Sequence, residues 1–296
     1  MQEKSAQASA GDYLFALPQY LLPHHFISRL TLWLTRVRAA WFKNAFMKWF
    51  INHFDVDMSQ AVETDYQQYP HFNAFFTRPL KPEARPIAGA KDVLCCPVDG
   101  AVSQAGAIEQ DTIFQAKGHD YSVQTLLGGY ADITQSFHDG QFATLYLSPR
   151  DYHRIHMPID GTLKQMVYVP GRLFSVNQQT VRCIPNLFAR NERVVALFDT
   201  AVGPMAMVLV GAINVACIET VWHGVVTPPH KQPVHRWVYD DQAAIQLEKG
   251  QEMGRFNMGS TVICVFADKT LQFDSAIKPG NAIRMGQTFA AVTPTE

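Results

Sequence analysis

Three short segments of this chain carry residue types that can do nucleophilic or acid–base chemistry. The first is Gly259-Ser260-Thr261, which leads into an apolar run that ends at Phe266. A glycine before a serine lets the backbone adopt conformations that other residues resist, and such strain can place the hydroxyl against the preceding carbonyl. Ser260 is therefore a candidate nucleophile, although the same triplet also fits an ordinary turn into a strand.

The second segment holds two histidines three residues apart, His153 and His156. Imidazole titrates near neutral pH, so either ring is a candidate general acid or base. The spacing would also suit two metal ligands on a helix, but no acidic or cysteine partner motif accompanies it, and we expect no metal here. A structural hydrogen-bonding pair is the alternative.

The third segment contains Asp99-Gly100, a pair that first predicts a tight turn. With a histidine and a serine elsewhere in the chain, Asp99 is also a candidate for orienting an imidazole, as in an Asp–His–Ser arrangement. Spacing along the chain does not show whether Asp99, His156 and Ser260 meet in space.

Short apolar runs broken by Gly, Pro, Asp and Asn dominate the chain after about residue 93. The runs are 142–147, 163–169, 194–198, 205–210, 213–218 and 261–266. Runs of this length and spacing predict a mainly β domain. The uncharged stretch 200–218 has the length of a membrane span, but Gly203, Pro204 and Gly211 interrupt it. We therefore expect two buried strands joined by a turn.

Residues 13–54 have a different character, because no acidic residue occurs between Asp12 and Asp55. Trp and Phe recur there at three- and four-residue steps, which is helical spacing. The cations in this region are Arg29, Arg36, Arg38, Lys43 and Lys48. Cationic helices with aromatic side chains suit the surface of an anionic bilayer. Helices packed on their own domain or on a second subunit are the alternative.

The sequence thus predicts an α+β fold in which an amphipathic helical arm precedes a β-rich domain. We divide the chain into a flexible N-terminus (1–12), a helical membrane-associating region (13–80) and a β-rich catalytic domain (81–296). The formal net charge of -1 argues against a general nucleic-acid binder. The five cysteines form no C-x-x-C pair, so we expect buried thiols in a reducing compartment. No signal peptide is visible.

Together these segments resemble the phosphatidylserine decarboxylase family. The resemblance covers most of the chain, and the matching segments follow one another in the family's order. They are FFTRPL (75–80), ARP (84–86), PVDG (97–100), YLSPRDYHRIHMP (146–158), PGRLFSVN (170–177), NER (191–193) and GQEMGRFNMGS (250–260). The family usually has Leu before the Gly-Ser-Thr triplet, where this chain has Met258, a swap close in volume and polarity.

The resemblance implies a proenzyme that cuts itself between Gly259 and Ser260. Ser260 would attack the carbonyl of Gly259, with His156 as the base and Asp99 orienting its ring. β-Elimination and loss of ammonia would then convert Ser260 into a covalent pyruvoyl group. The products would be chains 1–259 and 260–296, held together as a heterodimer, and a homodimer of such pairs is expected.

The resemblance also implies decarboxylation of phosphatidylserine to phosphatidylethanolamine. The substrate amine would form a Schiff base with the pyruvoyl group at Ser260, which accepts electrons as carbon dioxide leaves. His153 is the candidate proton donor, because we expect it to lie one helical turn from His156. No metal or diffusible cofactor is expected. A diacyl lipid substrate would bring the enzyme, as a peripheral protein, to the cytoplasmic face of the cell membrane, an anionic surface.

Three other functions stay open on the sequence alone. A serine hydrolase could use Asp99, His156 and Ser260 without cutting the chain, but no G-x-S-x-G elbow is present. A non-catalytic peripheral membrane protein would explain the cationic arm and leave the histidine and serine segments without a purpose. A pyruvoyl-dependent decarboxylase of soluble amino acids would explain the cut and would not need the arm.

Overall fold

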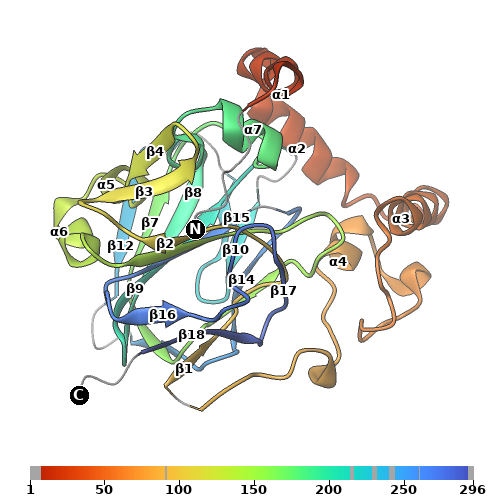
Figure 1. Ribbon diagram of the computed structural model, residues 1–296. Coiled ribbons are helices and arrows are strands. Elements are labelled where there is room, and N and C mark those ends of the chain that lie inside the picture. Colours follow the sequence, from red (N-terminus) through yellow and green to blue (C-terminus); the bar gives the residue numbers. More distant parts are fainter. Residues whose placement is uncertain are drawn as a thin grey trace.

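Helices occupy the N-terminal part of the chain and strands form most of the rest, so the α+β prediction is confirmed (Figure 1). The computed structural model describes residues 8–90, 92–213, 217–228, 232–239, 244–259 and 261–292. Ser260 and residues 1–7 lie outside these ranges.

The N-terminal helices lie along one side of the β-rich body (Figure 1) and begin before residue 13. They are α1 (Ala10–Ala16), η1 (Leu17–Leu21), α2 (His24–Leu34), α3 (Ala40–Phe54), η2 (Tyr66–Gln68), α4 (Phe72–Phe76) and η3 (Pro82–Ala84). Ser9 and Asp12 form a capping box, which satisfies free N–H groups and starts α1 at Ala10. Asp12 also pairs with Arg182 at 2.9 Å, so residues 10–12 form an anchored first turn rather than a flexible tail.

The largest sheet in the described part of the chain has nine strands, all paired antiparallel. Its order is β12-β7-β8-β9-β15-β5-β2-β17, and β13 also pairs with β7. The strands are β2 (Gly100–Ala107), β5 (Gln141–Tyr146), β7 (Gly161–Val169), β8 (Arg193–Thr200), β9 (Gly203–Val210), β12 (His235–Val238), β13 (Ile245–Leu247), β15 (Thr261–Phe266) and β17 (Ala282–Ile283). All six residues of β15 are buried, because the strand is central and covered on both faces, which explains its unbroken apolar run.

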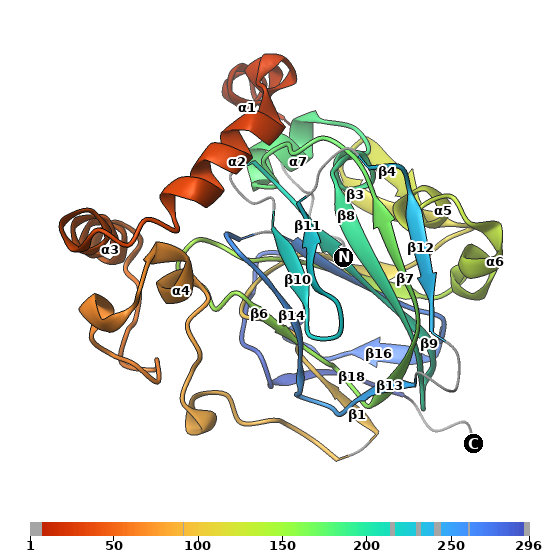
Figure 2. The same cartoon turned by 180° about the vertical axis from the view of Figure 1, so that it is seen from behind.

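Three smaller sheets and five short helices complete the body over the residues that the structure describes. Their elements are β1 (Val93–Cys95), β3 (Thr112–Ala116), β4 (His119–Ser122), β6 (Arg154–His156), β10 (Ile218–Thr220), β11 (Gly224–Thr227), β14 (Glu252–Phe256), β16 (Leu271–Phe273), β18 (Thr288–Val292), α5 (Val123–Leu126), α6 (Ala131–Thr134), η4 (Gln135–Phe137), α7 (Gln178–Cys183) and α8 (Leu187–Arg190). The sheets run β11-β10-β14-β6, β1-β18-β16 and β3-β4. Figure 2 shows β10, β14 and β6 between α4 on one side and β7 and β12 on the other.

Five of the six predicted apolar runs are confirmed as strands β5, β7, β8, β9 and β15. Of the described residues in the run 213–218, only Ile218 lies in a strand, because β10 begins there; residues 214–216 lie outside the described ranges. No helix in the described ranges is long and apolar enough to cross a membrane. All five cysteines are free and buried, as expected.

The apolar interior forms two clusters. The larger one fills the β-rich body, and the smaller one lies between α3, α4 and the loops around them. The smaller cluster consists of Met47, Phe50, Val56, Tyr69, Phe72, Phe75 and Phe76. Met258 packs against both clusters, so the segment before the predicted cut touches the helical region and the β-rich body at once.

Candidate active site

His153 is completely buried immediately before strand β6. Its ring stacks on Phe76 of α4, with ring centroids 4.0 Å apart and planes inclined by 21°. Neither ring nitrogen has a hydrogen-bond partner among the described residues. Burial lowers the pKa of His153 to about 3, and the nearby charge of Arg78 acts in the same direction. The imidazole is therefore neutral near physiological pH.

Gly259 lies directly against the His153 ring. A Cβ added at Gly259 would be 2.7 Å from Cε1 of that ring, so this position has no room for a side chain. The preceding residue, Met258, has φ of +101°, which is costly for a residue with a side chain. The backbone before the predicted scissile bond is thus both tightly packed and strained.

Asn257, which directly precedes Met258, anchors this strained segment through hydrogen bonds. Its backbone N–H donates to the carbonyl of Cys217 at 2.9 Å, and its side-chain amide accepts a hydrogen bond from Nδ2 of Asn73 at 2.8 Å. On the C-terminal side of Ser260, Thr261 begins β15 and pairs with Tyr146 and Val210. Ser260 lies outside the described residues, and its chain neighbours are Gly259 on the His153 ring and Thr261 in the central strand.

His156, at the end of β6, has both ring nitrogens engaged. Nδ1 lies 2.7 Å from the carbonyl oxygen of Gly250, which can only accept, so Nδ1 carries the proton. Nε2 is then the acceptor for the Tyr152 hydroxyl at 3.1 Å. Burial lowers the pKa of His156, while the Gly250 carbonyl and the carboxylates of Glu252 and Asp99 act in the opposite direction. The ring is a neutral base whose basic nitrogen is Nε2.

Asp99 is buried near His156, but its carboxylate is engaged by other groups. Arg85 Nε donates to Oδ1 at 2.8 Å, Arg85 Nη2 donates to Oδ2, and the backbone N–H of Met285 donates to Oδ1 at 2.8 Å. The backbone N–H of His156 donates to the carbonyl of Pro97 at 2.9 Å, which brings the two segments together. Among the described residues, the His156 ring bonds to Gly250 and Tyr152 rather than to Asp99.

The expectation that His153 and His156 lie one helical turn apart is wrong. Arg154–His156 form strand β6, and residues three apart on extended chain point to opposite sides. One ring therefore faces α4 and Gly259, while the other faces Tyr152 and Gly250. The sequence reasoning also missed Arg78, Arg85 and Tyr152 as neighbours of the site, although each lies in a segment that carried the resemblance.

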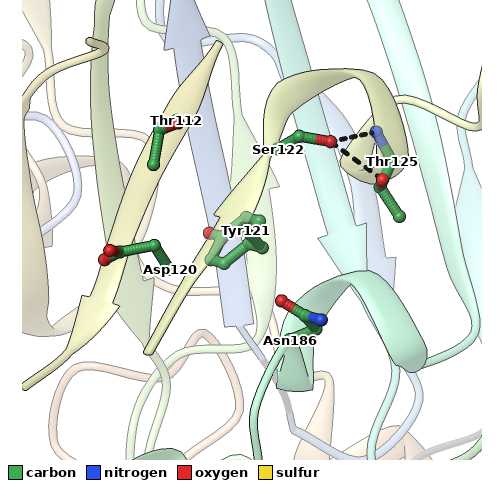
Figure 3. A pocket seen from close by; sticks show the side chains of 6 residues that line it. All are labelled: Thr112, Asp120, Tyr121, Ser122, Thr125 and Asn186. Atoms are coloured by element: carbon green, nitrogen blue, oxygen red, sulfur yellow. Dashed lines mark hydrogen bonds between the residues drawn. The ribbon is translucent and has the colours of Figure 1, made fainter. Parts of the chain in front are cut away.

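A cavity of about 390 Å³ elsewhere in the body does not belong to this site (Figure 3). It is lined by the β3–β4 hairpin, α5 and the residue before α8, none of which contributes to the groups above. Ser122 there accepts a hydrogen bond from the backbone N–H of Thr125 and caps α5, so its hydroxyl has a structural role.

The comparison with known protein families decides the family. A sequence model described as phosphatidylserine decarboxylase matches residues 72–291, and a second, described as PSD, matches residues 14–55. The chain belongs to the phosphatidylserine decarboxylase family. The members of this family are carboxy-lyases, and the match spans Asp99, both histidines and the predicted scissile bond.

Curated members of the phosphatidylserine decarboxylase family align with almost the whole chain. The phosphatidylserine decarboxylase proenzyme of Pseudomonas putida (strain GB-1) is 57% identical over 279 residues, covering 94% of this chain and 97% of that protein. The proenzyme of Pseudomonas entomophila (strain L48) is also 57% identical over 279 residues, with the same coverage. That of Pseudomonas aeruginosa (strain LESB58) is 56% identical over 284 residues, covering 95% and 98%.

Proposed function

We propose that this chain converts phosphatidylserine to phosphatidylethanolamine after cutting itself between Gly259 and Ser260. The observation that carries the proposal is the packing of Gly259, directly after the strained residue Met258, on the buried imidazole of His153, which has no hydrogen-bond partner in the described ranges. A strained peptide beside a neutral imidazole suits an enzyme that first processes its own backbone and then uses the same place for its substrate.

Self-cleavage needs a nucleophile, a base and a labile peptide. Ser260 Oγ attacks the carbonyl carbon of Gly259, and its proton passes to Nε2 of His156 once Tyr152 gives up its hydrogen bond. The peptide nitrogen leaves as an amine and an ester remains. Loss of the α-proton of Ser260 and rupture of its Cβ–Oγ bond release the Gly259 carboxylate and leave dehydroalanine. Water then displaces the nitrogen as ammonia, which gives the pyruvoyl group.

The surroundings of residue 260 fit a pyruvoyl group. Among the described residues, neither His153 nitrogen nor Oγ1 of Thr261 has a hydrogen-bond partner. His153, which packs on Gly259, and Thr261, which follows residue 260 in the chain, therefore offer polar groups that could bind such a group. When present, the group supplies a ketone that captures the substrate amine and an electron sink for decarboxylation. His153 holds the proton that the α-carbon needs. Its neutral state in the uncut chain must change as Gly259 leaves the ring and the anionic substrate arrives, because both raise its pKa.

The direct test of this function is the intact mass of the purified chain under denaturing conditions. We expect two fragments of about 29 and about 4 kDa, for residues 1–259 and 260–296, the smaller one blocked to N-terminal sequencing. The S260A variant should stay whole and inactive. A wild-type chain that stays whole and keeps Ser260 would contradict self-processing and leave the serine hydrolase, which esterase assays would detect.

Replacing Gly259 with alanine (G259A) is expected to slow self-cleavage by about 100-fold, because the new Cβ must displace the scissile peptide or the His153 ring. The fraction of uncut chain over time after synthesis measures this. The matched control is G106A, since a Cβ at Gly106 meets nothing within 4 Å. Equal cutting of G259A and G106A would show that the close packing at Gly259 does not matter.

The helical region carries the second part of the proposal, docking on an anionic membrane. Its inner side is anchored to the body: Gln19 accepts a hydrogen bond from the backbone of Ser175 at 2.9 Å. Its outer side exposes large apolar residues. These are Tyr13, Leu14, Phe15, Leu17, Leu21, Leu22, Phe26, Leu30, Trp33, Leu34, Trp41 and Trp49. Such a surface, with its basic residues, favours a lipid substrate over a soluble amino acid.

Four of the five cations predicted for membrane contact are exposed, and Lys43 is not. Its ammonium group is buried against Gln67, donating to the backbone carbonyl at 2.7 Å. The exposed cations are Arg29, Arg36, Arg38 and Lys48. We assign residues 13–80 to the membrane-associating region, 81–296 to the catalytic domain, and the protein to the cytoplasmic face of the cell membrane.

Replacing both Trp33 and Trp41 with alanine is expected to weaken binding to vesicles containing phosphatidylglycerol by at least about tenfold, since 66% and 80% of these residues are exposed. Activity on a soluble short-chain substrate should be unchanged. Vesicle sedimentation measures the binding, and F114A, which removes an exposed aromatic from β3, is the control. Undiminished binding of the double variant would contradict the assignment of this surface.

The assembly completes the proposal. Chains 1–259 and 260–296 form a heterodimer, and by family resemblance two heterodimers form a homodimer. Light scattering of the cut protein gives the mass of the assembly, and a mass of one heterodimer would contradict the pairing.

A further inference from the structure

Within the part of the chain that the structure describes, Arg78 is a buried cation without an anionic partner. The residue is only 3% exposed, its Nε has no hydrogen-bond partner there, and Nη2 makes one long bond of 3.3 Å to the carbonyl of Arg150. Its guanidinium also lies over the Phe75 ring, 5.5 Å from the centroid. Among the described residues, no carboxylate oxygen is within 4 Å of it. Burying an arginine with so few partners costs free energy.

Each of the other buried or half-buried arginines in the described ranges binds a carboxylate or several backbone carbonyls. Arg85, Arg154, Arg182, Arg236 and Arg255 each bind a carboxylate, although Nε of Arg236 also lacks a hydrogen-bond partner. Arg193, which is just as buried as Arg78, donates four hydrogen bonds of 2.6–2.8 Å to backbone carbonyls. The incomplete bonding of Arg78 is therefore not a general feature of the interior.

Arg78 lies beside His153. Phe76, two residues before Arg78, stacks on the His153 ring, and the carbonyl that Arg78 binds belongs to Arg150, three residues before His153. Arg154 Nε donates to the carbonyl of Thr77 at 3.0 Å, so the two segments run side by side. The unpaired guanidinium and the unpaired imidazole therefore share one buried region.

We propose that Arg78 binds the phosphodiester of the substrate headgroup, an inference that rests on the proposed function. The phosphorus of a phosphoserine headgroup is three bonds from the α-carbon, about 4 Å away when extended. A donor that serves the α-carbon and a cation that binds the phosphate must therefore be close neighbours, as His153 and Arg78 are. Guanidinium groups bind phosphate oxygens bidentately.

The phosphate is a better partner for Arg78 than the substrate carboxylate. The carboxylate loses its charge as carbon dioxide leaves, so a cation bound to it would stabilise the ground state more than the transition state. The phosphate keeps its charge throughout the reaction. Arg78 is then a residue for binding and specificity, and its loss should raise KM for substrates that carry the phosphate. Any change in kcat, which would act through the pKa of His153, should be the same with and without the phosphate.

The test compares two soluble substrates with the cut enzyme: a short-chain phosphatidylserine, and an O-alkylserine of similar length that lacks the phosphate. We expect R78Q to raise KM for the first by about 100-fold and to leave KM for the second unchanged. R78K should give a smaller, still selective rise, because lysine keeps the charge and loses the fork geometry. R284Q, which removes an exposed arginine, should behave as wild type.

Inorganic phosphate should inhibit the wild type competitively and should inhibit R78K more weakly. If R78Q does not fold or is not cut, the KM values of R78K for the two substrates provide the test. Equal losses on both substrates, an unchanged KM in R78K, or a wild type insensitive to phosphate overturn the proposal for Arg78. A wild type that is cut and decarboxylates neither substrate would instead overturn the proposed function.

Discussion

The H153Q variant is expected to cut itself normally and to decarboxylate at least about 100-fold more slowly than the wild type. Glutamine has nearly the volume of histidine, so the contacts with Phe76 and Gly259 remain largely filled. It cannot take up and release a proton near neutral pH. Self-cleavage does not use this ring in the proposed mechanism, so the two activities should separate.

The separation is measured on one preparation, by intact mass for the cut and by release of carbon dioxide from a short-chain substrate. The matched control is H24Q, because His24 is also buried with a lowered pKa and an unpartnered Nε2, but lies on α2. A fully active H153Q enzyme would show that His153 takes no part in decarboxylation. An uncut H153Q chain would indicate that His153, and not His156, is the base for self-cleavage.

Replacing His156 with glutamine (H156Q) is expected to leave the chain uncut on the timescale on which the wild type is fully processed, a loss of at least about 100-fold. The proposed base is Nε2, and it must be neutral to accept the Ser260 proton. Because burial lowers the pKa of His156, the wild-type cleavage rate should rise with pH, reach half its maximum below pH 6.5 and stay constant above.

Cell-free synthesis at a series of pH values, with denaturing gels over time, gives this profile. Y152F provides a matched variant, because it removes the hydroxyl bonded to Nε2 and leaves the base in place. It should cut at least as fast as the wild type. Normal self-cleavage of H156Q would show that a group other than His156 accepts the Ser260 proton.

The sequence predicts the central strands of the β-rich body well because they are mostly apolar and buried. The clearest case is Thr261–Phe266, a continuous apolar stretch in which every residue is buried. The helical reading of the histidine pair failed because a spacing of three residues occurs in any structure, and only tertiary contacts with Phe76 and Gly250 reveal the two environments.

The sequence predicts which residues form the candidate site, but only some of the contacts between them. Asp99 was expected to orient His156, yet its described bonds go to Arg85 and Met285, which reach it from distant parts of the chain. The burial of Lys43 and Arg78 could not be predicted either, because isolated cations in a sequence normally indicate solvent. Such residues reveal their roles only through what surrounds them.

The position of β15 has a consequence for the order of events in the life of the protein. This strand follows the cut, but it lies between β5 and β9, which precede it. In the same short piece, β18 pairs with β1 and β17 pairs with β2. Before the cut, residues 260–296 are covalently linked to the rest of the chain, so their strands can pair with β1, β2, β5 and β9 within one molecule. Before cutting, refolding is a one-body process that does not depend on concentration. After cutting it requires two chains to meet, so the melting temperature should rise with protein concentration.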